Sequence, residues 1–298
     1  MDIFTHAVAI LVILFATGNA GFIPFGVLGA VIIDIDMAFF FIPRCNPSLY
    51  LLHHGGFSHS IAGAAILGII AFGAALGLSP AGFLPGTIPK AIIIPALACV
   101  LAGAYLHLFL DSLASPGLPL LYPLTEKRFG LALFPMPVYF LITVLALASL
   151  AVIFFQGLTQ GLAVVYGAIF TVLIVAGAGM KWVVHRKVRG RSFPTLNPFQ
   201  WIVIQEENPS YSVMVYDMFR GVLRELNFEK YRNITPEEAR RYNSPELRRH
   251  RYFSYIETVE KNGSEITFHD PVREEGLISF PPWYPAVTIS AGDVHRIG

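Results

Sequence analysis

The sequence predicts an all-α polytopic membrane bundle followed by a small α+β soluble domain, and three observations support this fold class. The 298-residue chain is 54% hydrophobic and only 14% charged, which excludes an ordinary soluble protein. Its charge is unevenly distributed: residues 1–180 hold four Lys or Arg and five Asp or Glu, while residues 181–298 hold the other 17 and 15. The apolar part also divides into segments long enough to cross a bilayer. We therefore expect a transmembrane helical domain at 1–183 and a cytoplasmic α+β domain at 184–298.

About six transmembrane helices are expected, because a span needs about 20 mostly apolar residues. They are residues 3–18, 22–42, 57–78, 89–113, 136–156 and 161–183. The first segment begins MDIFTHAVAI and lacks the basic start of a signal peptide, so we expect it to be retained as a span.

The placement of Lys and Arg predicts the orientation of these spans. Arg44, Lys127 and Arg128 fall in alternate loops, and the tail opens with KWVVHRKVRGR. Only Lys90 lies near an opposite end. The positive-inside rule then places both termini in the cytoplasm of a multi-pass protein of the cell membrane.

The tail carries strand and helix signals in alternation, which predicts the α+β domain. Paired strands are expected at 201–207 and 211–219, and a helix at 235–242, which opens with Thr-Pro-Glu-Glu. The segment 253–270 contains an Asn-Gly turn typical of a β-hairpin, and 286–292 reads as a further strand.

Eight His and Asp residues within or next to the first four expected spans lie near cytoplasmic ends. They are His6, Asp34, Asp36, His53, His54, His59, His107 and Asp111. Ionisable groups within spans are energetically costly and indicate a functional site. Imidazoles and carboxylates are ligands of zinc and comparable metals, so this convergence favours a metal centre.

The spacing within this set predicts some of its geometry. His107 and Asp111, four residues apart in HLFLD, share one helix face. Asp34 and Asp36 would point nearly opposite ways in a regular helix, so either the helix loosens or one ligates while the other orients a histidine. In HHGGFSHS the glycines allow a histidine to turn back, and Ser58 is expected to cap the third span.

Taken singly, these residues have simpler interpretations. A histidine at a helix end is commonly interfacial, DID can be a solvated pair, HxxxD can hold two helices together, and the histidine cluster can be a pH-sensitive loop. Their shared depth is what favours a metal site. The two cysteines, Cys45 and Cys99, form no motif and imply neither a disulfide nor a cysteine metal site.

Four motifs resemble one known family. "THAV" (5–8), "GAVIIDIDMAFF" (29–40), "HHGGFSHS" (53–60) and "HLFLDSLASPGLPLLYPL" (107–124) are similar, in order and spacing, to the YdjM/YbcI-type membrane-bound metal-dependent hydrolases. The chain departs from that pattern at Ile33, where Pro is frequent, at Met37, where a His often follows DID, and in a Gly-Gly where Arg-Gly is usual.

The resemblance implies a divalent-metal hydrolase. The ligands it implies are His6, Asp34 or Asp36, His54, His59, His107 and Asp111. A weaker likeness, by analogy alone, links the alternation of His, Asp and HxxxD to zinc-dependent phospholipase C.

Combining these inferences, we expect the metal ligands to be Asp34, Asp36, His59, His107 and Asp111. His6 and His54 are expected to be catalytic, completing the ligand shell or carrying a proton. The ion is expected to be Zn, with Mn and Mg as alternatives, in one to three copies. In the loop after HLFLD, Tyr122, Lys127 and Arg128 are candidates for contacting substrate, although positive-inside topology alone also explains the two cations.

A hydrolytic centre at headgroup depth suits the phosphoester of a membrane lipid or lipid-linked substrate, and no nucleic-acid partner is expected. The alternative class is a metal-ion transporter or a metal-stabilised scaffold without catalysis. Transporters commonly place sites at the midplane between internal repeats, and no repeat is evident. A serine hydrolase using Ser58 or Ser112 is disfavoured because no G-x-S-x-G elbow occurs.

Overall fold

The computed structural model describes residues 1–298 except 40, 79–87, 136–139, 279–285 and 291–298. The chain folds into two compact units. An N-terminal unit comprises 1–42 and 51–178, and a C-terminal unit comprises 43–50 and 179–298. Each unit is described separately below.

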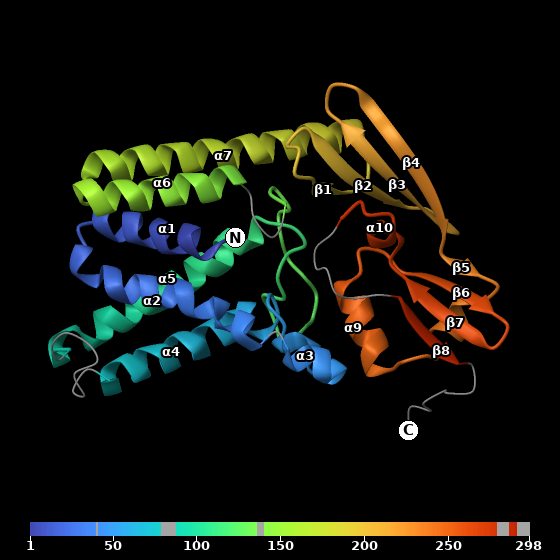
Figure 1. The fold of residues 1–298 in the computed structure, drawn as a ribbon, viewed down its shortest axis with the longest axis horizontal. Helices are drawn as coiled ribbons and strands as arrows, with labels where there is room; N and C mark the ends of the chain where they lie inside the picture. Colours follow the sequence, from blue (N-terminus) through green and yellow to red (C-terminus); the bar gives the residue numbers. More distant parts are fainter. Residues whose placement is uncertain (40, 79–87, 136–139, 279–285, 291–298) are drawn as a thin grey trace. The chain divides into compact units, whose positions relative to one another are not determined.

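The N-terminal unit is helical. Its helices are α1 (Ile3–Ala16), α2 (Ile23–Ile32), α4 (Ile61–Leu78), α5 (Ile93–Ser112), α6 (Phe140–Gln156) and the first part of α7 (Gln160–Lys187). Short 3-10 segments extend or precede them: Ala20–Phe22, Ile33–Phe39, Phe57–His59 and Lys90–Ile92. Helices α1, α2, α4 and α5 pack side by side (Figure 1).

Among the residues that the structure describes, four helical segments are long and apolar enough to cross a membrane, which supports a membrane protein with a helical N-terminal part. They are Ala20–Phe39, Ile61–Leu78, Lys90–Ser112 and Gln160–Lys187. The other two expected spans correspond to shorter apolar helices of 14 and 17 residues, α1 and α6. Residues 136–139 of the expected fifth span lie outside the described residues.

Glycines allow α2 and α5 to approach at backbone distance. A Cβ added to Gly29 would collide with the Val100 carbonyl, and one added to Gly103 would collide with the carbonyl of Gly26. Small residues at helix contacts are the usual solution in membranes, where association depends on van der Waals packing rather than on the hydrophobic effect. The pairing of α2 and α5 therefore depends on the absence of side chains at these positions.

The chain after α2 continues as a 3-10 helix, Ile33–Phe39, which holds both aspartates of DID. With three residues per turn, side chains two apart diverge by about 120° rather than the ~160° of an α-helix. Asp34 and Asp36 are both buried. The regular α-helix thus ends at Ile32 and continues as a tighter 3-10 helix, rather than loosening as one of the two expected arrangements required.

The C-terminal unit is α+β, as the sequence predicts. One sheet has the order β1-β2-β3-β4 and is fully antiparallel, from β1 (Arg191–Pro194), β2 (Gln200–Glu206), β3 (Ser210–Asp217) and β4 (Gly221–Glu229). The other has the order β5-β6-β7-β8, from β5 (Tyr231–Arg232), β6 (Thr258–Asn262), β7 (Glu265–His269) and β8 (Val287–Ser290). Helices α8 (Pro236–Ala239), α9 (Pro245–Phe253) and α10 (Pro271–Glu274) complete it.

The first sheet is covered on both faces. Ile202, Ile204 and Val213 pack with Tyr255 and Val272 on one face. Trp201, Val203, Met214 and Tyr216 pack with Val184 of α7 on the other. The expected hairpin is present at Thr258–His269, but its first residues differ from the expectation because Phe253 ends α9.

A segment from the membrane part of the sequence also belongs to the C-terminal unit. Residues 43–50 include most of α3 (Ile42–Cys45) and the start of the 3-10 segment Pro47–Leu52. Arg249 of α9 donates to the Pro43 carbonyl at 3.0 Å, and the ring of Tyr252 lies 5.3 Å from that of Tyr50. Tyr50 is buried by this packing.

Asp270 is a buried carboxyl group at the start of α10. It accepts a hydrogen bond from the Tyr255 amide at 2.9 Å, and burial raises the pKa of its side chain to about 6 from 3.8. The folded unit therefore binds a proton more tightly than the unfolded chain does. The stability that the protonated Asp270 side chain contributes is fully present below about pH 4. It is lost as the pH rises through about 6.

We predict that Gly103→Ala destabilises the protein by at least about 1–3 kcal/mol, because the new methyl group meets backbone atoms that cannot move independently. Thermal unfolding of the detergent-purified protein, followed by size-exclusion chromatography, measures the effect. The matched control is Gly73→Ala in α4, where a Cβ meets open space and should be neutral or slightly stabilising. Equal midpoints for the two variants would contradict the close packing of α2 on α5.

We also predict that the C-terminal unit loses up to about 3 kcal/mol of stability between pH 4 and pH 7 through Asp270. The urea midpoint, followed by the fluorescence of buried Trp201 at several pH values, measures this slope. Asp270→Asn should reduce the slope, while Glu265→Gln, at an exposed position of β7, should leave it unchanged. A slope unchanged in Asp270→Asn would contradict the assignment.

Candidate metal centre

The polar residues expected at one depth come together on one side of the helical bundle. His6 lies in the first turn of α1, and Asp34 and Asp36 follow α2. His59 lies just before α4, and His107 and Asp111 are in the last turns of α5. These four helix ends meet in the N-terminal unit (Figure 1), and each of these side chains is buried there.

Two imidazoles and two carboxylates form the centre of the cluster. The Nε2 atoms of His59 and His107 are 3.3 Å apart. Oδ1 of Asp34 lies 3.5 and 3.4 Å from these two nitrogens, and Oδ2 of Asp111 lies 3.4 and 3.5 Å from them. One oxygen of Asp34 and one of Asp111 thus each face the same pair of imidazole nitrogens.

His6 adds a third imidazole. Its Nε2 lies 3.2 Å from Oδ1 of Asp111, and its ring stacks on that of His107 with centroids 3.7 Å apart. The Met1 amine also donates to Oδ1 of Asp111. Oδ2 of Asp111 is therefore the oxygen that faces His59 and His107.

A backbone contact sets the tautomer of His107. Its Nδ1 lies 2.6 Å from the carbonyl oxygen of Ala30 in α2, and a carbonyl only accepts, so Nδ1 carries the proton. The Nε2 lone pair then points toward the carboxylates. Metal-binding histidines commonly donate their other N–H in this way.

The buried oxygens of this cluster have the character of a cation site. Oδ1 of Asp34 and Oδ2 of Asp111 are buried and have no hydrogen-bond partner among the described residues. Buried carboxylate oxygens are costly without a positive or donating neighbour. Three groups in this cluster are spaced to hold an ion: His6 with His107 and Asp111, Asp34 with His59 and His107, and Asp36 with His54 and His59. The residues present therefore fit a divalent metal.

Asp36 lies behind the central atoms rather than among them. It is 2.9 Å from Nδ1 of His54 and 3.1 Å from Nδ1 of His59, and it accepts a hydrogen bond from the Ser58 hydroxyl. Since Asp36 contacts the Nδ1 side of His59, the Nε2 side remains directed at Asp34. This geometry lets Asp34 ligate while Asp36 orients the histidines.

The structure brings His54 to these carboxylates, whereas Nδ1 of His53 faces the backbone carbonyl of His54 at 3.0 Å. The side chain of His54 is 18% exposed, in contrast to the fully buried His6, so His54 is better placed to meet a substrate. Ser58 does not cap the third span as expected. Helix α4 begins later, and the Ser60 hydroxyl accepts from the Gly63 amide instead.

The loop after α5 folds back toward the cluster. Burial lowers the pKa of His53. The Tyr122 ring packs against Phe57, two residues before His59, with centroids 6.1 Å apart. Lys127 instead lies over the Phe129 ring.

Comparison with known families identifies the family of this chain. The family model described as YdjM inner membrane protein matches residues 1–183. The chain belongs to the YdjM family. No curated protein and no solved structure matches it. All residues of the metal cluster lie within the part matched to YdjM, while most of the C-terminal unit lies outside it.

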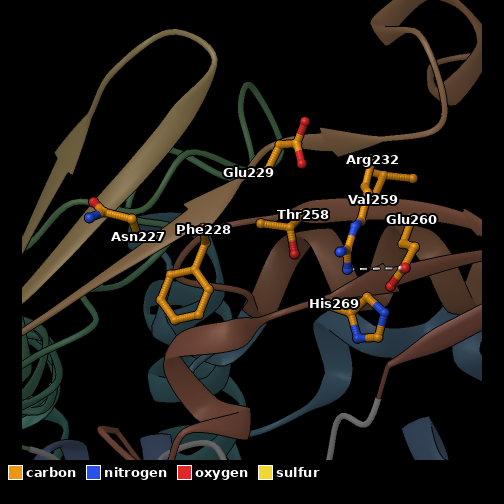
Figure 2. Close-up of a pocket in the computed structure, with 8 residues that line it drawn as sticks. All are labelled: Asn227, Phe228, Glu229, Arg232, Thr258, Val259, Glu260 and His269. Carbon is orange, nitrogen blue, oxygen red and sulfur yellow. Dashed lines mark hydrogen bonds and ion pairs between the residues drawn. The ribbon is translucent and has the colours of Figure 1, made fainter.

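A hollow lies in the C-terminal unit, outside the YdjM match. It has a volume of about 340 Å³ and is lined by Asn227, Phe228, Glu229, Arg232, Thr258, Val259, Glu260 and His269 (Figure 2). Arg232 pairs with Glu260 at 3.4 Å, and His269 with Glu274 at 2.9 Å. Within the described ranges, every His and carboxylate group spaced to hold an ion belongs instead to the YdjM-matched part.

We predict that Asp34→Asn and Asp36→Asn differ in their effect on metal binding. Asp34→Asn removes a ligand and should leave metal content near background. Asp36→Asn removes an orienting contact and should weaken affinity by about 10–100-fold. Elemental analysis and chelator competition on purified protein measure both, with Ser112→Ala, a half-buried position on the same helix as His107, as control. An equal loss in the two variants would mean that Asp36 is itself a ligand.

Proposed function

We propose that this YdjM-family chain is a membrane-embedded, metal-dependent hydrolase that cleaves a phosphoester of a lipid or lipid-linked substrate at the cytoplasmic membrane face. The observation that carries the proposal is that Asp34 and Asp111 each face the imidazole nitrogens of His59 and His107 at the ends of apolar helices. In this proposal α1 and α6 also cross the membrane, giving six spans with both termini cytoplasmic.

The donor set favours Zn as the ion, with Mn or Mg as alternatives. Imidazole nitrogens together with carboxylate oxygens match the ligand preference of zinc, whereas Mg prefers oxygen alone. A divalent ion held there supplies Lewis-acid chemistry and lowers the pKa of bound water. A single ion fits the contacts around Nε2 of His59 and His107. A second would use Asp36 and His54.

The chain's own residues supply orientation and proton transfer. Ala30 and Asp36 fix the rings of His107 and His59 through their Nδ1 atoms. Asp36 also holds Nδ1 of His54, so that Nε2 of His54 can give or accept a proton at the substrate. His6 is buried too deeply for that role and is assigned to the ligand shell.

The substrate class follows from depth and charge. The cluster lies at the ends of apolar helices, and we propose that these ends are at the level of the lipid phosphates. Arg128, in the loop that follows α5, is proposed to offer a cation for the phosphate. Tyr122 and Lys127 belong to the same loop and are proposed to contact the headgroup.

We predict that His107→Ala and Asp111→Ala each lose bound metal and lower hydrolysis of lipid phosphates by at least about 100-fold, because each removes a ligand of the reacting centre. Phosphate release from short-chain phosphatidic acid and isoprenoid phosphates in detergent micelles measures activity. Ser112→Ala should keep full activity, since its hydroxyl bonds to the Phe109 carbonyl of its own helix. This control also tests Ser112 as a nucleophile.

The outcome separates the two functional classes. Unchanged metal content and activity in His107→Ala and Asp111→Ala would exclude the hydrolase. A wild-type protein that binds metal, releases no phosphate and carries metal into liposomes in a His107-dependent way would identify a transporter instead. Bound metal with neither activity nor flux would identify a structural centre.

A further inference from the structure

Apolar side chains are exposed at two neighbouring turns of the first sheet. Leu196 and Phe199 lie in the turn between β1 and β2, and Phe219 lies in the turn between β3 and β4. Their exposures are 80%, 44% and 79%. Large apolar side chains grouped on a surface indicate an interaction site. We call these two turns the aromatic tip.

The aromatic tip is an ordered feature. The Met218 amide donates to the Phe199 carbonyl at 3.0 Å and joins the two turns. The rings of Phe199 and Phe219 lie 5.2 Å apart. The Asp217 carboxylate accepts from the amides of Phe219 and Arg220, each at 3.0 Å, and fixes the second turn. The rings are therefore held outward by the local fold.

The aromatic tip lies beside the last turns of α7 (Figure 1). Nζ of Lys187 donates to the Met218 carbonyl at 3.4 Å, and Met218 packs with the cluster that contains Val184. Helix α7 is one of the four candidate spans, and Lys181 is its first charged residue. Lys187 is six residues further on, which is roughly 9 Å along the helix. The tip is thus at the level where α7 leaves the hydrocarbon.

The charges around the tip identify its partner. Arg186, Lys187 and Arg220 are exposed cations, and Arg186 lies over the half-exposed Trp182 ring at 4.1 Å. Trp together with basic residues marks the membrane interface, and anionic headgroups attract such cations. A second copy of the chain would bring an identical set of cations against this one, which is repulsive.

We propose that the aromatic tip inserts Leu196, Phe199 and Phe219 into the headgroup region of the membrane face from which α7 emerges. Apolar side chains at an interface typically enter about 5–10 Å into the boundary between headgroups and acyl chains. The sheet is then held against the bilayer at two points: the covalent connection to α7 and the tip. This inference does not depend on hydrolase activity.

Site-directed spin labelling of the full chain in lipid nanodiscs containing phosphatidylglycerol tests the proposal. Cys45→Ser and Cys99→Ala remove the native thiols, and the label is placed at Phe219→Cys or Leu196→Cys. The control is Glu207→Cys in the turn between β2 and β3, an exposed position at the opposite end of the same strands. Collision with oxygen, relative to collision with a water-soluble nickel complex, reports immersion.

The expected result is a several-fold higher ratio of oxygen to nickel accessibility at residues 219 and 196 than at 207. Equal ratios at the three positions would mean that the tip faces water, and the proposal would be wrong. Spin–spin broadening at 219 that disappears on dilution with unlabelled protein would identify a second copy as the partner and would also overturn it. Size-exclusion chromatography of each labelled protein confirms that it is folded.

Discussion

The backbone contact between α2 and α5 is the constraint on which the metal cluster depends. Because Gly29 and Gly103 carry no side chains, the two helices approach closely enough for the Ala30 carbonyl of α2 to reach Nδ1 of His107 on α5. The same approach brings Asp34, just after α2, to 3.4 Å from Nε2 of His107. The close packing of α2 on α5 thus determines both the tautomer of His107 and its distance from Asp34.

The arrangement of the cluster also lowers the electrostatic cost of burying its three aspartates. Three aspartates buried among apolar helices would be strongly unfavourable if each stood alone. Here each carboxylate contacts at least one imidazole nitrogen, and the whole set lies at helix ends rather than mid-span. A divalent ion would add positive charge beside the oxygens of Asp34 and Asp111 that accept no hydrogen bond among the described residues.

Much of this arrangement could be predicted from the sequence because ionisable residues are rare in the apolar part, so few combinations exist. The close spacing of His107 and Asp111 and the turn-back of HHGGFSHS carry direct geometric information. Other features leave little trace in the sequence. The contact between the Ala30 carbonyl and His107 involves a backbone group, so no pattern of side chains in the sequence predicts it. The start of α4 at Ile61 depends on Ser60, although Ser58 fits a cap equally well by residue type.

In the C-terminal unit, the sequence predicts the strands that have many buried side chains. The strands β2 and β3 are rich in buried Val and Ile, which makes them recognisable. Strand β4 is largely exposed at the edge of its sheet and alternates poorly, and α9 is short and highly charged, so neither was expected. Tertiary context determines such elements more than local sequence does.

The segment 43–50 gives the C-terminal unit a particular relation to the chain. It lies in sequence between Asp36 and His54, two residues that contact each other in the cluster, yet it packs with Tyr252 and Arg249. Residues 179–298 of the C-terminal unit thus bind the segment 43–50, which connects Asp36 to His54 in the sequence. Being tethered, it binds at a high effective concentration that needs no large affinity. A chain that ended at residue 183 would keep the segment 43–50 but would lose Arg249 and Tyr252, which bind it.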